Sequence, residues 1–184
     1  AGGTLGNDLG GFSSSDDESI RITAISVLDS GQASSEGGNT AVDVSQGTCG
    51  TNCDDVDNTC TAEPFYDTRV SIKVVNNTRR NVRFTSLRYI VPESTGTGTS
   101  SFTSDTIRFI GESTATAQGG EATLTALVYN ASGGGKSFFG SSSDIPATLG
   151  FRNVTFIVTG TTLDGETVTV RGTTILSFGD FNNC

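Results

Sequence analysis

The chain has 184 residues and a formal net charge of −9 at pH 7, and apolar residues make up only 34% of it. It contains no His, Met or Trp, which excludes an imidazole base, a Ser-His-Asp triad and any His metal ligand. An anionic chain repels phosphate, so we expect no nucleic-acid partner. No apolar run approaches the ~20 residues that a membrane-spanning helix needs, so we expect no membrane span.

The first segment, residues 1–19, reads AGGTLGNDLGGFSSSDDES and is dominated by Gly, Ser and Asp. Its large apolar residues are Leu5, Leu9 and Phe12. We predict an N-terminal arm, which either folds back on its own domain or pairs with an open sheet edge of another subunit. Because the chain begins at Ala1 without Met or an apolar leader, we expect a mature chain after signal-peptide removal, or a trimmed one.

Residues 20–184 show the alternation of apolar and polar residues that is typical of half-buried strands, and little helical periodicity. Strands are predicted around residues 20–28, 42–44, 70–74, 82–91, 107–109, 122–128, 154–158, 168–170 and 175–178. The alternation slips by one residue at 24–25 and at 85–86, which predicts β-bulges, and Asp-Gly at 164–165 predicts a two-residue hairpin turn. This pattern favours a single all-β domain, an antiparallel β-sandwich of about seven to nine strands.

An acidic, loop-rich insert is predicted at residues 30–67, and it contains the stretch CGTNCDDVDNTC. The four cysteines of the chain are Cys49, Cys53, Cys60 and Cys184. Their even number favours disulfides in an oxidising, extracytoplasmic setting, and their spacing suits neither a zinc site nor a CxxC redox motif. Three pairings are possible. We favour one local bridge within residues 49–60 and one bridge that staples this loop to Cys184.

The same stretch offers oxygen ligands for a metal ion. Asp54, Asp55 and Asp57 stand close together in the sequence, and Ca²⁺ prefers hard oxygen ligands. The spacing of an EF-hand loop is not met, so the alternative is a solvated acidic loop between the bridges. Calcium is therefore the one cofactor that we consider, and no other cofactor is expected.

Charge is distributed unevenly along the chain. Residues 1–67 carry twelve acidic residues and a single arginine, for a net charge of −11, whereas residues 68–184 carry +2. Residues 68–92 hold six basic residues and no acidic one. This segment is either a solvated strand face or a basic patch that meets the acidic end of a second copy, head to tail. The residues expected at such an interface are Leu5, Leu9, Phe12, Ile20, Ile22, Arg79, Arg80 and Arg83.

Three Asn-x-Ser/Thr sequences offer acceptor sites for N-glycosylation, at Asn76, Asn130 and Asn153. We expect Asn76 and Asn130 to be accessible at strand ends, whereas Asn153 enters a predicted strand. Glycosylation is therefore predicted at Asn76 and Asn130 alone.

Two stretches carry a resemblance to a known kind of domain. VSIKVVNNTRRNVRFTSLRYIVP at 70–92 resembles a strand, an Asn-rich turn and a second strand, and VTFIVTGTTLDGETVTVRGTTILSFGDF at 154–181 resembles a closing hairpin and last strand. Both resemble immunoglobulin-like domains of bacterial and archaeal surface proteins and filament subunits. The resemblance implies an immunoglobulin-like sandwich in an extracellular or cell-surface location, and it brings no catalytic residues.

These observations lead to an expected function. We expect no enzymatic activity. A pair of acidic residues could serve a glycoside hydrolase, but the substrate groove of such an enzyme usually offers aromatic platforms for the sugar, and this chain has no Trp. The first hypothesis is a structural subunit of an extracellular filament or surface assembly, in which copies polymerise head to tail by β-strand complementation. The alternative is a monomeric cell-surface adhesin or carbohydrate-binding module, either with or without bound calcium. Residues 1–29 would supply the donor, either the arm or the strand at 20–28.

Overall fold

The computed structural model describes residues 13–15, 19–29, 40–50, 60–92 and 101–181. These residues form strands and turns but no helix, so the all-β class predicted from the sequence is confirmed. A search of the same residues finds no helix with the length and apolar character needed to cross a membrane.

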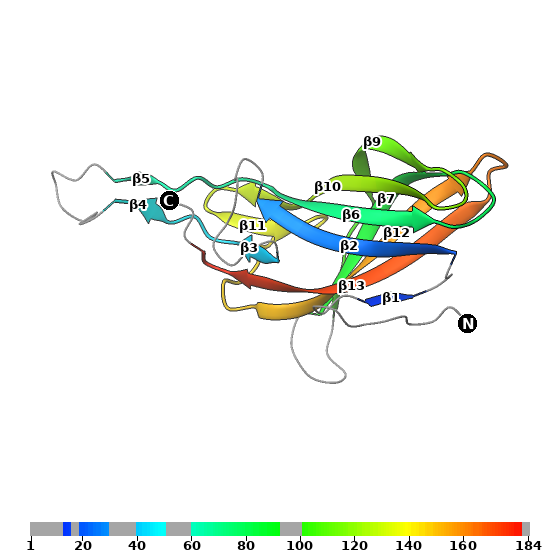
Figure 1. Ribbon diagram of the computed structural model, residues 1–184. Helices are drawn as coiled ribbons and strands as arrows, with labels where there is room; N and C mark the ends of the chain where they lie inside the picture. Colours follow the sequence, from blue (N-terminus) through cyan, green and yellow to red (C-terminus); the bar gives the residue numbers. More distant parts are fainter. Residues whose placement is uncertain (1–12, 16–18, 30–39, 51–59, 93–100, 182–184) are drawn as a thin grey trace.

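Two sheets build the body of the molecule (Figure 1). The larger sheet has the strand order β1-β13-β12-β7-β8, and in addition β3 pairs with β13 and β9 pairs with β7. Its strands are β1 (Ser13–Ser15), β3 (Ala41–Asp43), β7 (Val82–Pro92), β8 (Ser101–Thr103), β9 (Ile107–Ala115), β12 (Gly150–Thr162) and β13 (Thr167–Gly179). All of its pairings are antiparallel except that of β3 with β13, which is parallel.

The smaller sheet is antiparallel throughout and has the order β11-β10-β6-β2. Its strands are β2 (Ile20–Asp29), β6 (Thr68–Asn76), β10 (Gly120–Ser132) and β11 (Gly135–Phe138). A separate two-stranded ribbon consists of β4 (Thr48–Cys49) and β5 (Thr61–Ala62). Figure 1 shows this ribbon projecting beyond one end of the two sheets, the end toward which β13 runs.

Alternating apolar residues on both sheets face each other and form one core. On β6 the side chains of Val70, Ile72 and Val74 are buried, and on β12 those of Phe156 and Val158 are buried, all within one cluster. Removing such side chains from water stabilises the fold by roughly 1.5–3 kcal/mol each. The molecule is therefore a β-sandwich, as the period-two pattern indicated.

The details of the strands both match and correct the predictions. Register shifts lie between Ile22 and Ala24 and between Phe84 and Ser86, at or beside the two predicted bulges. The predicted two-residue turn at 164–165 is wrong, because β12 and β13 are joined by the four residues 163–166. The N–H of Gly165 donates to the carbonyl of Thr162, so residues 162–165 form a β-turn inside this longer loop. Gly165 ends that turn with φ 86°, a backbone conformation that favours glycine.

Part of the predicted insert belongs to the sandwich itself. Strand β3 lies within residues 30–67 and pairs in parallel with the last part of β13, with Ala41 opposite Ser177 and Asp43 opposite Gly179. Val42 and Val44 are buried in the common core. The alternation at 42–44 predicted a strand there, but it did not predict the partner strand, because parallel pairing of strands so far apart in the sequence leaves no local signal.

Candidate functional site

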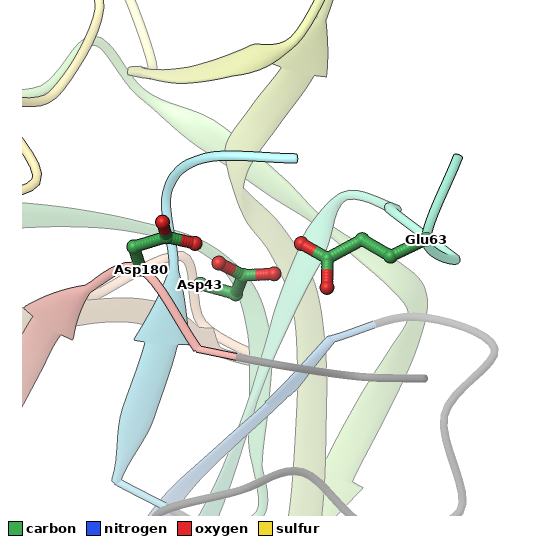
Figure 2. Close-up of side chains that lie close together, drawn as sticks. All are labelled: Asp43, Glu63 and Asp180. Atoms are coloured by element: carbon green, nitrogen blue, oxygen red, sulfur yellow. The ribbon is translucent and has the colours of Figure 1, made fainter. Parts of the chain in front are cut away.

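Three acidic side chains from distant parts of the chain converge where the β4-β5 ribbon meets the sandwich. They are Asp43 at the end of β3, Glu63 just after β5 and Asp180 just after β13. One carboxylate oxygen of each lies within 4.8 Å of the others, and Figure 2 shows the three side chains pointing toward one another. Asp43 and Glu63 are buried, with exposed fractions of 1% and 3%, whereas Asp180 is exposed. We call this group the carboxylate cluster.

Backbone hydrogen bonds hold Asp43 in the cluster. Its Oδ1 accepts from the N–H of Phe181 at 3.1 Å and from the N–H of Ser45 at 3.4 Å. The N–H of Val44 donates to the carbonyl of Gly179 at 2.9 Å. Asp43 therefore ties the insert to the end of the last strand, and this contact brings Asp180 beside it.

A second set of bonds holds Glu63. Its Oε1 accepts from the N–H of Gly47 at 2.7 Å, and its own N–H donates to the carbonyl of Gly47 at 3.0 Å. The amide Nε2 of Gln46 donates to the Glu63 carbonyl at 2.9 Å. These bonds join the residues before β4 to the residue after β5 at the base of the ribbon. They also hold the Glu63 side chain so that its carboxylate points toward Asp43.

The electrostatics of the cluster disfavour full ionisation. The pKa of Asp43 is raised from 3.8 to about 7, chiefly by burial and in part by the nearby negative charge of Glu63. Hydrogen bonds from Phe181 and Ser45 and the positive charge of Lys136 act in the opposite direction. Lys136 is itself fully buried, and its Nζ donates to Thr68 Oγ1 at 3.0 Å. Additional positive charge at the cluster would favour the ionised form of Asp43.

Carboxylates in this arrangement are suited to a hard divalent cation. Three carboxylates offer up to six oxygen atoms, and Ca²⁺ takes six to eight oxygen ligands. Sequence reasoning did not find this group, because its members stand far apart in the chain and only the pairing of β3 with β13 and of β4 with β5 brings them together. The ligands predicted instead, Asp54, Asp55 and Asp57, lie outside the described residues.

The cysteines are only partly covered by the structure. Cys49 lies on β4 and Cys60 directly precedes β5, and neither is a free thiol. Cys53 and Cys184 lie outside the described residues, so the pairing stays a prediction. The carboxylate cluster shows independently that the base of the ribbon and the end of β13 are neighbours, because it draws on Glu63 and Asp180.

The predicted apolar interface residues fall into two groups. Leu5, Leu9 and Phe12 lie outside the described residues. Ile20 and Ile22 are buried on β2, which pairs with β6, and both belong to the core of the same chain. In this structure the strand at 20–28 therefore completes its own sandwich.

The predicted basic residues lie at the end of the sandwich opposite the carboxylate cluster. Arg80 Nη1 contacts Asp164 at 2.9 Å and Glu166 at 2.7 Å, and Arg83 Nε contacts Glu112 at 3.4 Å. All these side chains are exposed, so each ion pair stabilises the fold only slightly. Arg79 and Arg80 also line a groove of about 410 Å³, together with Ile20, Val82 and Val168.

The expected accessibility of Asn76 is wrong. Its side chain is fully buried, because it fills the turn that joins β6 to β7 and bonds to that turn on both sides. Asn130 is half-buried near the end of β10. Asn153, for which the sequence suggested a strand interior, does lie in β12, but its side chain is exposed.

Comparisons with known proteins return no match. No family model matches the chain, and neither a curated protein nor a solved structure matches it. The fold and the site define the class, a β-sandwich with a carboxylate cluster at one end, and function has to be inferred from the chain's own residues.

Proposed function

We propose that this protein is a structural subunit of an extracellular filament or surface assembly, in which copies join by β-strand addition. One observation carries the proposal. Strand β1, which belongs to the predicted arm, pairs antiparallel with the edge of β13, with Ser13 opposite Thr173 and Ser15 opposite Arg171. The arm can therefore act as an added strand, and the edge of β13 is a surface that accepts one.

Exchange between copies needs no new kind of contact. The backbone bonds that join β1 to β13 within one chain are equally available between the arm of one copy and β13 of the next. The concentration of subunits then decides between the closed monomer and the open polymer. Because donor and acceptor surfaces differ, each copy can bind two neighbours, and a contact of this kind that does not close into a ring yields a filament.

The topology agrees with this proposal. Strands β2, β6 and β10 lie side by side in one sheet, and β7, β12 and β13 lie side by side in the other. We interpret this order as an immunoglobulin-like sandwich, with β13 as its last strand. We also propose that disulfides staple the ribbon to the chain end and that the protein works outside the cytoplasm, where disulfides persist.

Deleting residues 1–19 is expected to abolish assembly and leave the sandwich folded. The full chain should elute as large species in size-exclusion chromatography at high concentration and show filaments by electron microscopy. The deletion variant should elute as a monomer with an unchanged far-ultraviolet circular dichroism spectrum. A full chain that stays monomeric at high concentration contradicts the proposal.

Two point variants test the same contact without shortening the chain. Ser14→Pro lacks a backbone N–H and disfavours strand pairing, so it should reduce assembly, whereas the matched Ser14→Thr should assemble like the parent. Polymers that persist after deletion of residues 1–19 would show that another segment is the donor. A different contact would then join the copies, and the edge of β2 would be the next acceptor surface to test, because its outer side pairs with no strand within the described part of the chain.

The carboxylate cluster favours a second candidate function, that of a calcium-binding surface module such as an adhesin or carbohydrate-binding domain. Calcium would neutralise Asp43, Glu63 and Asp180 and fix the ribbon at the end of the sandwich. Loops at that end would then form the binding surface, and this function is compatible with a monomer.

Titration of the metal-free full chain with Ca²⁺ in a calorimeter tests the second candidate. We expect binding at pH 8 that weakens as the pH falls below about 7, because a protonated Asp43 must release its proton to bind the cation. Asp43→Asn should weaken binding at least tenfold. Glu121→Gln, an exposed acidic site on β10, should not change it. Absence of binding heat and of a calcium-induced rise in melting temperature removes this candidate.

A further inference from the structure

The fold gives the asparagines of the three Asn-x-Ser/Thr sequences different surroundings. Asn76 is buried, Asn130 is half-buried and Asn153 is exposed. An N-linked glycan is bulky and hydrophilic, and it extends into solvent from the amide nitrogen. A folded chain therefore tolerates a glycan best where the asparagine side chain is exposed.

Asn76 is incompatible with a glycan in the folded state. Its Nδ2 donates to the carbonyl of Arg80 at 2.7 Å and to the carbonyl of Ala115 at 2.9 Å. A sugar on Nδ2 would replace one of these two hydrogen atoms and would need space inside a fully buried site. A chain modified at Asn76 would lose that bond and could not close the turn between β6 and β7.

Asn153 lies on the outer face of the larger sheet. It stands directly opposite Ile175 of β13, and Phe151 lies two residues earlier on the same face of β12. Both neighbours are apolar and exposed, with exposed fractions of 70% for Phe151 and 39% for Ile175. The asparagine thus stands beside two apolar side chains that the fold leaves uncovered.

We propose that Asn153 is an N-glycosylation site and that the first sugars of its glycan cover Phe151 and Ile175. The apolar C–H faces of a sugar ring would pack on these side chains, while its hydroxyl groups stay in water. The inference rests on the extracytoplasmic setting of the proposed function, but not on assembly. The proposal reverses the earlier expectation for Asn153, because this residue lies in a strand and its side chain is nevertheless exposed on the outer face of the sheet.

The chemistry requires a lipid-linked oligosaccharide pyrophosphate and a transferase. Nδ2 of Asn153 forms a bond to the anomeric carbon of the sugar, and the bond between that carbon and the pyrophosphate oxygen breaks. The lipid pyrophosphate leaves with the bonding electron pair, and the amide proton passes to a base of the transferase. The product is an N-glycosyl amide, and no oxidant or reductant is consumed.

The fold also indicates when the modification occurs. β12 is a central strand, with Thr155 paired to Ile90 on one side and to Thr173 on the other. The hydroxyl groups of Thr155 and Thr173 are hydrogen-bonded at 2.9 Å. The transferase therefore has to reach the sequence Asn153-Val154-Thr155 before β12 enters the sheet, and the fold then accepts the product.

Glycopeptide mapping of the folded protein tests the proposal. The full chain, purified from its own cells and also secreted by a host with N-glycosylation, is digested before and after treatment with a peptide-N-glycosidase. We expect the glycan mass on the peptide that contains Asn153, and conversion of this residue to aspartate after deglycosylation. We expect no modification of Asn76 in the folded fraction. Unmodified Asn153 in the folded fraction of both sources overturns the proposal, whatever the state of the other two sites.

Matched variants separate the site from its neighbours. Asn153→Gln and Thr155→Ala should each remove one glycan mass from the secreted protein, whereas Thr155→Ser should keep it. Deglycosylation should increase the binding of an apolar fluorescent dye, and this increase should be smaller in Phe151→Ser. An equal increase in Phe151→Ser would show that the glycan does not cover the apolar pair. Because occupancy is measured on peptides after digestion, failure of the assembly hypothesis leaves this result unaffected.

Discussion

Replacing Asn76 with alanine is expected to lower the free energy of unfolding by about 2–4 kcal/mol. The side chain makes four hydrogen bonds, two from Nδ2 to the carbonyls of Arg80 and Ala115, and two to Oδ1 from the N–H and the hydroxyl of Thr78. Alanine removes all four bonds. The Thr78 hydroxyl and the Arg80 carbonyl keep the bond between them at 2.9 Å, but the other groups lose this partner, and a buried polar group without a hydrogen bond costs roughly 1–3 kcal/mol. Urea unfolding followed by circular dichroism at constant pH measures the loss.

Two further variants show whether the hydrogen bonds or the volume of Asn76 matter. Asn81→Ala removes a single bond, from the N–H of Ala117 to an exposed side chain in the same turn, and should cost less than about 1 kcal/mol. Asn76→Asp has the same shape but replaces the donor with an acceptor that faces two carbonyls, so it should destabilise at neutral pH as strongly as alanine does. An Asn76→Ala cost no larger than that of Asn81→Ala would refute this account of the turn.

Removing the hydroxyl group of Tyr89 is expected to destabilise the fold by about 1–3 kcal/mol, whereas removing that of Tyr129 should not. The Tyr89 hydroxyl donates to the carbonyl of Val128 at 2.6 Å and accepts from the N–H of Phe139 at 2.8 Å. Tyr89→Phe therefore leaves a buried carbonyl and an N–H without a partner. This hydroxyl links the larger sheet, through β7, to the backbone of β10 and to the end of β11.

Tyr129 provides a matched control within the same aromatic cluster. Its ring lies edge-on to Tyr89, with centroids 5.3 Å apart. Its hydroxyl is buried and makes no hydrogen bond with any described residue, and burial raises its pKa well above the usual value. Tyr129→Phe should be neutral or stabilising, because it removes a polar group that lost its water without gaining a partner. Thermal and urea unfolding of Tyr89→Phe and Tyr129→Phe measure both changes in stability. Equal losses in the two variants would contradict the role assigned to the Tyr89 hydroxyl.

Part of the fold could be predicted because burial on one face of a strand imposes a period of two. Val70, Ile72 and Val74 alternate with polar residues, and the structure places them in the core on β6. The bulge near residues 24–25 followed from a slip in the same pattern, since one extra residue reverses the faces of a strand. Short strands such as β4 and β11 carried too few residues to show any period.

The candidate sites could be predicted only where the signal is local. The three glycosylation sequences are visible in the chain. The alternation also puts Asn76 in phase with the buried Val74 and Asn153 out of phase with the buried Val154, but the expectation considered only whether each residue stood at the end of a strand or inside one. Asn76 ends a strand and looked accessible, yet its turn folds over it and its amide satisfies two carbonyls. The aspartates at 54–57 attracted attention because they are adjacent, whereas the carboxylates that the structure brings together are not.

The all-β class, the position of the long strands, the absence of histidine chemistry and the uneven charge of the chain could all be read from the amino-acid sequence. Those properties depend on composition and on neighbouring residues. The folded structure was needed to show that the arm strand β1 lies on β13, that β3 pairs with β13 in parallel, and that Asp43, Glu63 and Asp180 meet. These contacts join segments from opposite ends of the chain, and their free energy comes from backbone pairing and shared burial that no single segment encodes.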